Sequence, residues 1–393
     1  MHNLHGFYVF SYRPITDFHE IPAASGDQLA RKAWPSGEEQ GDVAMQQQAP
    51  SQLSEAELMV LATEALVGLG LSRRDAADAG RVLVLAEMFG VATHGVGRIE
   101  SYGERLEIGG INPRPDIVLE HVAPAIVRVD GDNGVGPLVG MRALKAAMDA
   151  AATGGVGLAL ARGSNHFGPV SPYSHIAAEA GFASLIGSNA TTTIAPWGGS
   201  EARLGNSPCG FGFPNPGGEP IILDMAISVA ARAKIRNAAK AGQPIPDTWA
   251  TDRAGKPTTD PNEALNGFLL PIGGHKGYGL ALVVDLLAGL LSGAAYLTHV
   301  KSWVESPESP QNLGHYFLLI DTKRLGTANW LSERMNDFVG ILHSTPPADP
   351  NAPVLVPGEI ENRNLMRARR DGIRVDPSLL AKLKALSARV AIA

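Results

Sequence analysis

A short segment near residue 94 combines three side chains that could bind a carboxylate and move a proton. His94, Arg98 and Tyr102 are spaced four residues apart, so on one continuous helix they would project from the same face. An imidazole titrates near neutral pH and can transfer a proton, whereas a guanidinium can hold a carboxylate through two parallel hydrogen bonds. A surface helix end with an ordinary arginine would have the same spacing, so spacing alone leaves both interpretations open.

A second histidine, His166, follows an apolar run that predicts a buried strand. The run covers 156–161, and the polar sequence Ser164-Asn165-His166 comes soon after it. Polar groups at the end of a buried strand are a common arrangement in active sites, although a single loop histidine is more often structural. A metal site built on His94 and His166 is the weaker hypothesis, because the sequence lacks the clustered histidine spacing of metal motifs.

Three glycine-rich segments could let backbone amides approach a phosphate group. They cover 196–199, which includes Gly198 and Gly199, then 204–208, and 273–279, which leads into a predicted helix. Glycine has no Cβ to obstruct such an approach, a helix N-terminus attracts anions, and Lys276 adds a positive charge beside it. A tight turn at the start of a core helix would also explain the last segment.

The dinucleotide fingerprint of a Rossmann fold is missing from the sequence. That fingerprint is G-x-G-x-x-G after a strand, with an acidic residue about 20 positions later. The nearest arrangement, Gly131, Gly134 and Gly136, has a different spacing. Asp224, after the apolar run 221–223, could accept a hydrogen bond from a ribose hydroxyl or cap the element that follows. A dinucleotide would therefore have to bind to a different architecture.

The elements that must position these residues change from helical to mixed after about residue 125. Ser54 and Glu57 have the spacing of a capping box ahead of a first helix, and apolar spacing predicts helices over 73–89 and 98–106. Apolar runs separated by glycine-rich turns then predict an α+β core. Its strands are expected over 125–129, 156–161, 182–186, 221–223 and 316–320, with helices over 138–152 and 277–291 covering the sheet.

Composition limits the classes of partner. The chain has 393 residues and a net charge of −6, so no basic field is available for nucleic acid and small molecules become the default partners. The apolar run 280–296 is interrupted by Asp285 and is too short to span a membrane, which predicts a buried core helix. Cys209 is the only cysteine, so no intrachain disulfide can form; with no secretory signal, we expect a cytoplasmic protein.

Six segments, in this order, resemble the malate/L-lactate dehydrogenase family of the non-Rossmann type. That family includes L-sulfolactate and ureidoglycolate dehydrogenases and Δ1-piperideine-2-carboxylate reductase. The resemblance covers roughly residues 53–373. The segments are HGVGRIESYGERLEIGGINP, ARGSNHFG, APWGG, DMAIS, IPDTWATDRAGKPTTDP and LLPIGGHKGYGLAL.

The resemblance implies an α/β fold of the L-sulfolactate dehydrogenase type, with a mixed sheet and a helical domain formed by both chain ends. Residues 1–50 would be a poorly ordered extension and 51–125 a helical N-terminal part. Residues 126–325 would form the nucleotide-binding mixed-sheet domain, and 326–393 a C-terminal helical part that packs with 51–125. The family also implies a homodimer with its site near the subunit contact.

The implied activity is hydride transfer between NAD or NADP and a small 2-hydroxy acid/2-oxo acid pair. His166 resembles the family's proton acceptor, and His94 would lie on the same wall. Arg98 and Tyr102 would hold the substrate carboxylate. No metal is implied. The residues that would bind the cofactor are Asp224, Met225, Ala226, Lys276, Gly358, Glu359 and Ile360, together with the glycine-rich turn at Gly198 and Gly199.

Four positions, in three segments, depart from the usual family sequence. Thr93 replaces a serine, Asn206-Ser207 replaces Thr-Asn in the segment 205–208, and Ile227 replaces a threonine. The first change bears on substrate fit, and the other two bear on the choice between NAD and NADP. Three other functions stay open: a cyclic imino-acid reductase on the same scaffold, a metal-dependent hydrolase using both histidines, and a cofactor-binding protein without catalysis.

Overall fold

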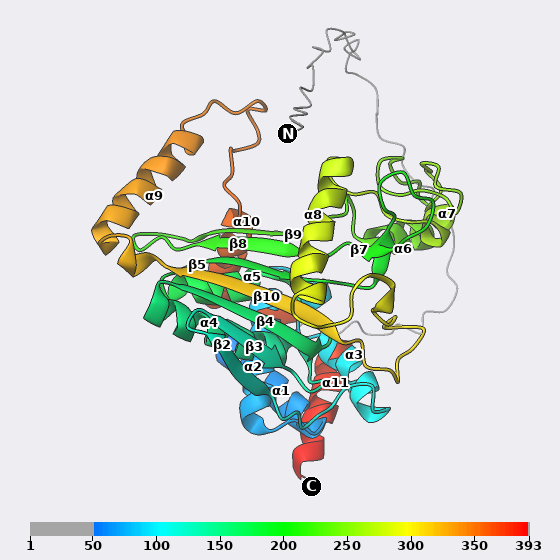
Figure 1. Cartoon of the computed structure of the whole chain (residues 1–393), viewed down its shortest axis with the longest axis horizontal. Helices are drawn as coiled ribbons and strands as arrows, with labels where there is room; N and C mark the ends of the chain where they lie inside the picture. Colours follow the sequence, from blue (N-terminus) through cyan, green and yellow to red (C-terminus); the bar gives the residue numbers. More distant parts are fainter. Residues whose placement is uncertain (1–50, 392–393) are drawn as a thin grey trace, which may run out of the picture. The chain divides into compact units, whose positions relative to one another are not determined.

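A seven-stranded mixed sheet forms the centre of the computed structural model, which describes residues 51–391 (Figure 1). The strand order is β2-β3-β4-β10-β5-β8-β9, with β3 and β4 parallel and every other neighbouring pair antiparallel. A Rossmann sheet, by contrast, is mostly parallel. The strands are β2 Val118–Ala123, β3 Ile126–Asp130, β4 Val156–Ser164, β5 Phe182–Ser188, β8 Cys209–Phe213, β9 Ile221–Met225 and β10 Leu313–Asp321.

All five strands predicted from apolar runs are present, as β3, β4, β5, β9 and β10. The other two strands of this sheet were not predicted. β2 is an edge strand with mostly exposed side chains, so it lacks the apolar run of a buried strand. β8 contains two glycines, which disfavour strands. They are needed there because a Cβ on Gly210 would lie 2.5 Å from the side chain of Val170, and one on Gly212 would lie 2.7 Å from that of Ser184.

Helices cover both faces of the sheet. α4 (Gly136–Gly154) and α5 (Ser171–Glu179) pack on one face, and α2 (Arg73–Met88) packs behind them. α8 (His275–Asp285) and the π-helical turn Leu286–Leu290 pack on the other face (Figure 1). Two apolar clusters form the core on the two sides of the sheet.

The run 280–296 is not the fully buried core helix that its apolarity predicted. Ala281 and Val284 face the sheet and are buried, whereas Val283 and Leu290 remain about half exposed. The helix covers the sheet with one face only, because nothing among the described residues packs over its other side. Within residues 51–391, no helix has the length and apolarity that a membrane span requires.

The two ends of the described chain lie together. β1 (Ser51–Leu53) pairs antiparallel with β11 (Ile373–Val375), and α1 (Glu55–Gly68) packs against α11 (Pro377–Ala388). The predicted capping box at the start of α1 is confirmed. The expected extension over 1–50 lies outside the described residues, and the domain boundaries near 125 and 325 stay predictions. The remaining elements are α3 Arg98–Glu107, α6 Arg232–Ala241, α7 Pro261–Asn266, α9 Ala328–His343, α10 Glu359–Asp371, β6 Thr192–Ile194 and β7 Leu204–Gly205.

The glycine series around residue 134 packs against the chain that leaves β4. A Cβ on Gly136 would lie 2.2 Å from the backbone oxygen of His166 and 2.3 Å from that of Asn165. A Cβ on Gly131 would lie 2.8 Å from the backbone oxygen of Gly163. These glycines therefore permit close backbone packing beside His166, which explains glycines at this place without a phosphate-binding role.

The substitution Gly136→Ala should destabilise the protein, because backbone atoms rather than flexible side chains oppose the added methyl group. We expect a loss of about 1–3 kcal/mol in the free energy of unfolding, measured by urea titration. Gly154→Ala, in the same helix, is the control, since a Cβ there meets no atom within 4 Å. Equal stability of the Gly136→Ala variant and the parent protein would contradict this packing argument.

Candidate active site

His94 ends a short 3-10 turn and does not lie on α3, which begins at Arg98. The helix predicted over 98–106 is confirmed as α3, but His94 does not share its face, because the chain turns around the carboxylate of Glu87 before α3 begins. The backbone N–H of Val96 donates to Oε2 of Glu87 over 3.1 Å. A Cβ on Gly95 would lie 2.0 Å from the same oxygen. A larger residue at this position would therefore have to displace the Glu87 carboxylate that the chain passes.

The structure nevertheless brings the two predicted histidines together. The rings of His94 and His166 stack with centroids 5.4 Å apart and planes at 28°. The hydroxyl of Tyr102, which is fully buried, lies 3.0 Å from Nδ1 of His166 and 3.3 Å from its backbone oxygen. Two segments that are more than 60 residues apart in the sequence thus meet at one imidazole. Its other nitrogen, Nε2, makes no hydrogen bond with any residue from 51 to 391.

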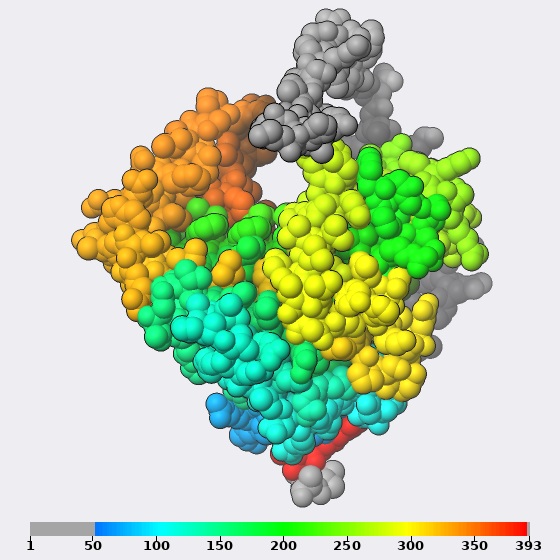
Figure 2. Space-filling model, viewed as in Figure 1, coloured from blue at the N-terminus to red at the C-terminus, as the bar shows by residue number. Residues whose placement is uncertain are grey.

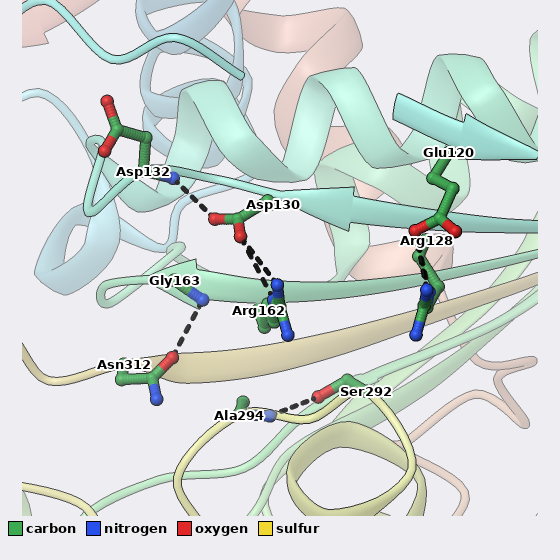
Figure 3. Close-up of polar contacts among 9 residues, drawn as sticks. All are labelled: Glu120, Arg128, Asp130, Asp132, Arg162, Gly163, Ser292, Ala294 and Asn312. Atoms are coloured by element: carbon green, nitrogen blue, oxygen red, sulfur yellow. Dashed lines mark hydrogen bonds and ion pairs between the residues drawn. The ribbon is translucent and has the colours of Figure 1, made fainter. Parts of the chain in front are cut away.

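The loop that carries His166 is fixed where it leaves β4 (Figure 3). Arg162 donates to Oδ2 of Asp130 on the neighbouring strand, with its Nη2 at 2.9 Å. The backbone N–H of Gly163 donates to Oδ1 of Asn312 over 2.9 Å. The side-chain amide of Asn165 then donates to a backbone oxygen of the turn after β3, also over 2.9 Å. These contacts from two neighbouring segments set the position of the next residue, His166.

A third histidine, His315, lies beneath this loop and was not predicted. It is fully buried on β10, with Nδ1 2.9 Å from Oγ of Ser188 and Nε2 2.7 Å from Oγ of Ser164. Its ring stacks on that of Phe167 at a centroid distance of 4.3 Å and an angle of 8°. The residue after His166 therefore rests on a buried ring whose two nitrogens both have partners. A lone histidine in an apolar strand gives no sequence signal for such a role.

Burial and one positive charge keep the two site histidines neutral. Burial and, to a smaller extent, the nearby Arg98 guanidinium lower the pKa of His94 to about 4. Burial also holds the pKa of His166 well below its usual value, with added effects from Arg98, His94 and His315. Both imidazoles are therefore unprotonated at neutral pH, so each can accept a proton.

The two Nη atoms of Arg98 are available to bind a carboxylate. Its Nε donates to the backbone oxygen of Thr93 over 2.8 Å, which orients the side chain. Its two Nη atoms make no hydrogen bond or ion pair with any residue from 51 to 391. A guanidinium with free Nη atoms can hold a carboxylate through two parallel hydrogen bonds. This geometry supports the prediction that Arg98 binds an anion.

Trp303, on the loop before β10, closes another side of the cluster. Its ring lies edge-on to His166 and Tyr102, with centroid distances of 6.1 and 5.9 Å. The buried Arg105 places its guanidinium 4.6 Å from the indole centroid. The sequence motifs did not point to Trp303, since it lies in an irregular segment. Arg105 could have been suspected, because it follows Tyr102 by three residues on α3 and so shares its face.

Three of the predicted cofactor residues line one cavity. Asp224, Gly358 and Ile360 border a space of about 360 Å³, together with Ser171 at the start of α5. Oδ2 of Asp224 accepts a hydrogen bond from the backbone N–H of Ser171 over 2.8 Å. Asp224 therefore caps α5, which precedes it in the chain, rather than the element that follows it. Burial raises the pKa of this carboxyl, while the hydrogen bonds from Ser171 act in the opposite direction.

A second group forms where glycine-rich turns meet the start of α8. The rings of Trp197 and His275 lie 5.7 Å apart, which places Gly198 beside the N-terminus of the helix that carries Lys276. Gly198 and Gly273 have positive φ angles of 81° and 59°, and a Cβ on either would meet open space. Exposed amides at a helix N-terminus, with a lysine beside them, fit the phosphates of a dinucleotide.

Met225 and Ala226 connect these two groups of residues. Met225 ends β9, and Ala226 leads to Ile227, whose N–H donates to the backbone oxygen of Asn206 over 2.8 Å. The N–H of Ile272, just before the α8 turn, donates to the oxygen of Ile227 over 2.9 Å. Neither Lys276 nor the turn at 198–199 borders the cavity around Asp224, so the predicted cofactor residues form two neighbouring groups, not one pocket.

Glu359 does not border the cavity around Asp224, although its chain neighbours Gly358 and Ile360 do. Its carboxylate lies 2.7 Å from Nε2 of His343 at the end of α9 and pairs with Arg363 within α10 at 3.3 Å. A larger cavity, of about 460 Å³, lies between α5, α9 and α10, and none of the predicted site residues borders it. Among residues 51–391, no group of three His, Cys, Asp or Glu side chains could hold a metal ion.

Residues 53–384 match the family model described as malate/L-lactate dehydrogenase. The chain belongs to this family. It is 36% identical to the L-sulfolactate dehydrogenase of Methanocaldococcus jannaschii over 324 residues, which cover 82% of this chain and 93% of the relative. It is 35% identical to a Δ1-pyrroline-2-carboxylate reductase of Ancylobacter novellus, covering 86% and 98%, and 32% identical to an NAD(+) ureidoglycolate dehydrogenase of Escherichia coli K12, covering 82% and 92%.

Family membership confirms both the resemblance and the fold class expected from it. The solved structure of the Methanocaldococcus jannaschii sulfolactate dehydrogenase matches with a TM-score of 0.79 at 35% identity, covering 87% of this chain and 98% of that one. This member of the family is an oxidoreductase, and its family implies a nicotinamide cofactor. The metal-dependent hydrolase hypothesis has no support among these relatives.

Replacing Arg98 should raise the pKa of both site histidines. In the Arg98→Gln variant the imidazolium forms would lose a repulsive neighbour, so His94 and His166 should take up protons at higher pH than in the parent protein. Histidine ring signals in an NMR titration would report this directly. Arg128→Gln is the matched control, because Arg128 pairs with Glu120 on the edge of the sheet. Unchanged histidine titrations in Arg98→Gln would refute the electrostatic role of Arg98.

Proposed function

We propose that this chain is an NAD(P)-dependent dehydrogenase that interconverts a small 2-hydroxy acid and its 2-oxo acid. The observation that carries the proposal is the convergence of His166, Tyr102, His94 and Arg98 from two distant segments. The names of the relatives, which include malate and sulfolactate dehydrogenases, support the same class of reaction.

The proton passes through Nε2 of His166. The hydroxyl of Tyr102 contacts Nδ1, so Nε2 is the ring nitrogen left for substrate. Because burial and Arg98 hold the pKa of His166 low, the ring is neutral and accepts the hydroxyl proton when the substrate is oxidised. In the reverse direction, the protonated ring donates that proton to the carbonyl oxygen.

Arg98 has two roles in this mechanism. Its free Nη atoms hold the substrate carboxylate and so orient the carbon that reacts. The bound carboxylate also offsets the positive charge that lowers the pKa of His166. Substrate binding therefore makes the imidazolium form of His166 less unfavourable, which helps proton transfer in both directions.

Two groups of residues would hold the cofactor. Asp224, with Gly358 and Ile360 around it, would accept hydrogen bonds from a ribose, and Lys276 with the turn at Gly198 would hold the phosphates. The bound nicotinamide ring supplies or accepts the hydride. NAD and NADP both remain part of the proposal; the name of the ureidoglycolate dehydrogenase supports NAD.

Reduction of a cyclic imino acid is the second candidate function. The Δ1-pyrroline-2-carboxylate reductase that is 35% identical to this chain favours it. Such a substrate also presents one carboxylate beside a C=N bond, so Arg98 and His166 could keep the same roles. Activity on a cyclic imine, without activity on any 2-oxo acid, would select this alternative.

The His166→Ala variant should lose turnover by about 10² to 10⁴, because it removes the proposed proton acceptor. Initial rates with NADH and NADPH against a panel of 2-oxo acids and cyclic imines would measure the loss. Cofactor binding, followed by fluorescence of the reduced nicotinamide, should change little. His121→Ala, an exposed histidine on β2, is the control. Full activity of His166→Ala would refute the assignment.

We also propose that the protein is a homodimer in the cytoplasm. None of the residues of α9 is buried, and Trp330, Phe338 and Ile341 lie on one face of that helix with exposed fractions of 41%, 56% and 62%. Figure 2 shows α9 standing off from α8, with a hollow between them. An apolar helix face of this kind fits contact with a second copy of the chain. The lone, buried Cys209 supports a reducing compartment.

The double variant Phe338→Asp/Ile341→Asp should shift the protein from dimer to monomer, because two charges would be buried in the contact. Sedimentation velocity or light scattering would give the mass of each species. Val60→Asp, which changes an equally exposed apolar residue on α1, should leave the dimer intact. A monomeric parent protein, or a double variant that stays dimeric, would contradict the assignment of α9.

A further inference from the structure

The uncharged indole of Trp303 forms one wall of the site, beside His166, the residue that would transfer the proton. The indole is edge-on to the ring of His166 at 6.1 Å and to that of Tyr102 at 5.9 Å. The side chain packs partly into the apolar core and remains partly exposed. Any substrate that places its reacting oxygen at His166 must therefore lie close to this apolar surface.

Arg105 fixes this wall and cannot serve the substrate. It is 1% exposed, and its guanidinium lies over the indole at 4.6 Å. Nη1 donates to the backbone oxygen of Trp303 over 3.3 Å, and Nη2 donates to that of Ser309 over 2.7 Å. The loop also packs closely on its support, since a Cβ on Gly110 would lie 2.0 Å from a loop carbonyl oxygen. Both Nη atoms of Arg105 are thus bound to backbone carbonyls, and its Nε is buried without a hydrogen-bond partner among the described residues.

Among residues 51–391, Arg98 is the cation with free Nη atoms next to the two site histidines, since Arg105 binds backbone carbonyls through both of its Nη atoms. Arg98 is the only Lys or Arg whose charge contributes to the pKa shifts of His94, Tyr102 and His166. One carboxylate would use the free Nη atoms of Arg98. A second acidic group on the same substrate would meet an indole with no cation to pair with, which is unfavourable for a charge leaving water.

We infer that Trp303 is a specificity-determining residue that selects substrates with a single acidic group. The preferred class is a 2-oxo, 2-hydroxy or cyclic imino monocarboxylate whose uncharged side chain packs on the indole. Dicarboxylates and sulfonated 2-oxo acids are the disfavoured class. This inference rests on the proposed function and goes beyond it, because several relatives carry names of enzymes for doubly acidic substrates.

A binding comparison tests the inference without requiring turnover. L-Lactate and tartronate differ only in a methyl group replaced by a carboxylate, so calorimetric titration of the full chain with each, in the presence of NADH or NADPH, isolates the second charge. We expect L-lactate to bind about 10- to 100-fold more tightly. Equal or tighter binding of tartronate would overturn the inference. Tighter lactate binding by a protein that turns over no oxo acid or imine would sink the proposed function, whereas turnover of an oxo acid together with equal binding of the two ligands would sink the inference alone.

Variants at residue 303 then assign the selectivity to the indole. The ratio of kcat/KM for pyruvate to that for oxaloacetate should fall at least about tenfold in Trp303→Arg, because a cation would pair with the second carboxylate. Trp303→Phe keeps an apolar aromatic ring and should leave the ratio within about threefold. Should Trp303→Arg fail to fold, Trp303→Ala, which removes the wall, should still reduce the selectivity. An unchanged ratio in every folded variant that lacks the aromatic ring would overturn the inference.

Discussion

The contact between Tyr102 and His166 joins the helical segment around α3 to the end of the central strand β4. Because Tyr102 is buried and its hydroxyl meets Nδ1 of the imidazole, the ring presents Nε2 and nothing else to a substrate. The stacked His94 and the nearby Arg98 then act on a ring whose orientation is already set. Without Tyr102, no hydrogen bond among the described residues would join α3 to the ring of His166.

The sheet supplies the rigidity that this contact needs. β4 is held by neighbours on both sides, and the residues just before His166 bond to segments after β3 and before β10. The glycine at 136 lets α4 press against the backbone of the loop. His315 supports the loop from beneath through Phe167. A base that must meet a small substrate within hydrogen-bond distance benefits from a support of this kind.

The sequence allowed prediction of the elements that follow simple periodic rules. The strands with apolar runs and the capped helix α1 were found, because burial on both faces or a capping box leaves a local signature. β2 and β8 were missed, since an exposed edge and a glycine-rich strand leave none. Among the site residues, His94, Arg98, Tyr102 and His166 could be singled out by type and spacing. Trp303 and His315 could not, because their importance arises from contacts made across the fold. The sequence also could not show that His94 lies outside α3, because the Glu87 carboxylate that accepts from the chain before this helix is a tertiary contact.

The buried His315 has a thermodynamic consequence for the whole molecule. Burial lowers its pKa from 6.5 in the unfolded chain to about 3 in the folded one. Above about pH 6.5 the ring is neutral in both states and imposes no penalty. As the pH falls below that value, the ring takes up a proton in the unfolded chain but not in the folded one. The free energy of unfolding therefore decreases by up to about 1.4 kcal/mol per pH unit until the folded ring also titrates. The histidine beneath the loop thus makes the folded protein less stable in acid than near neutral pH.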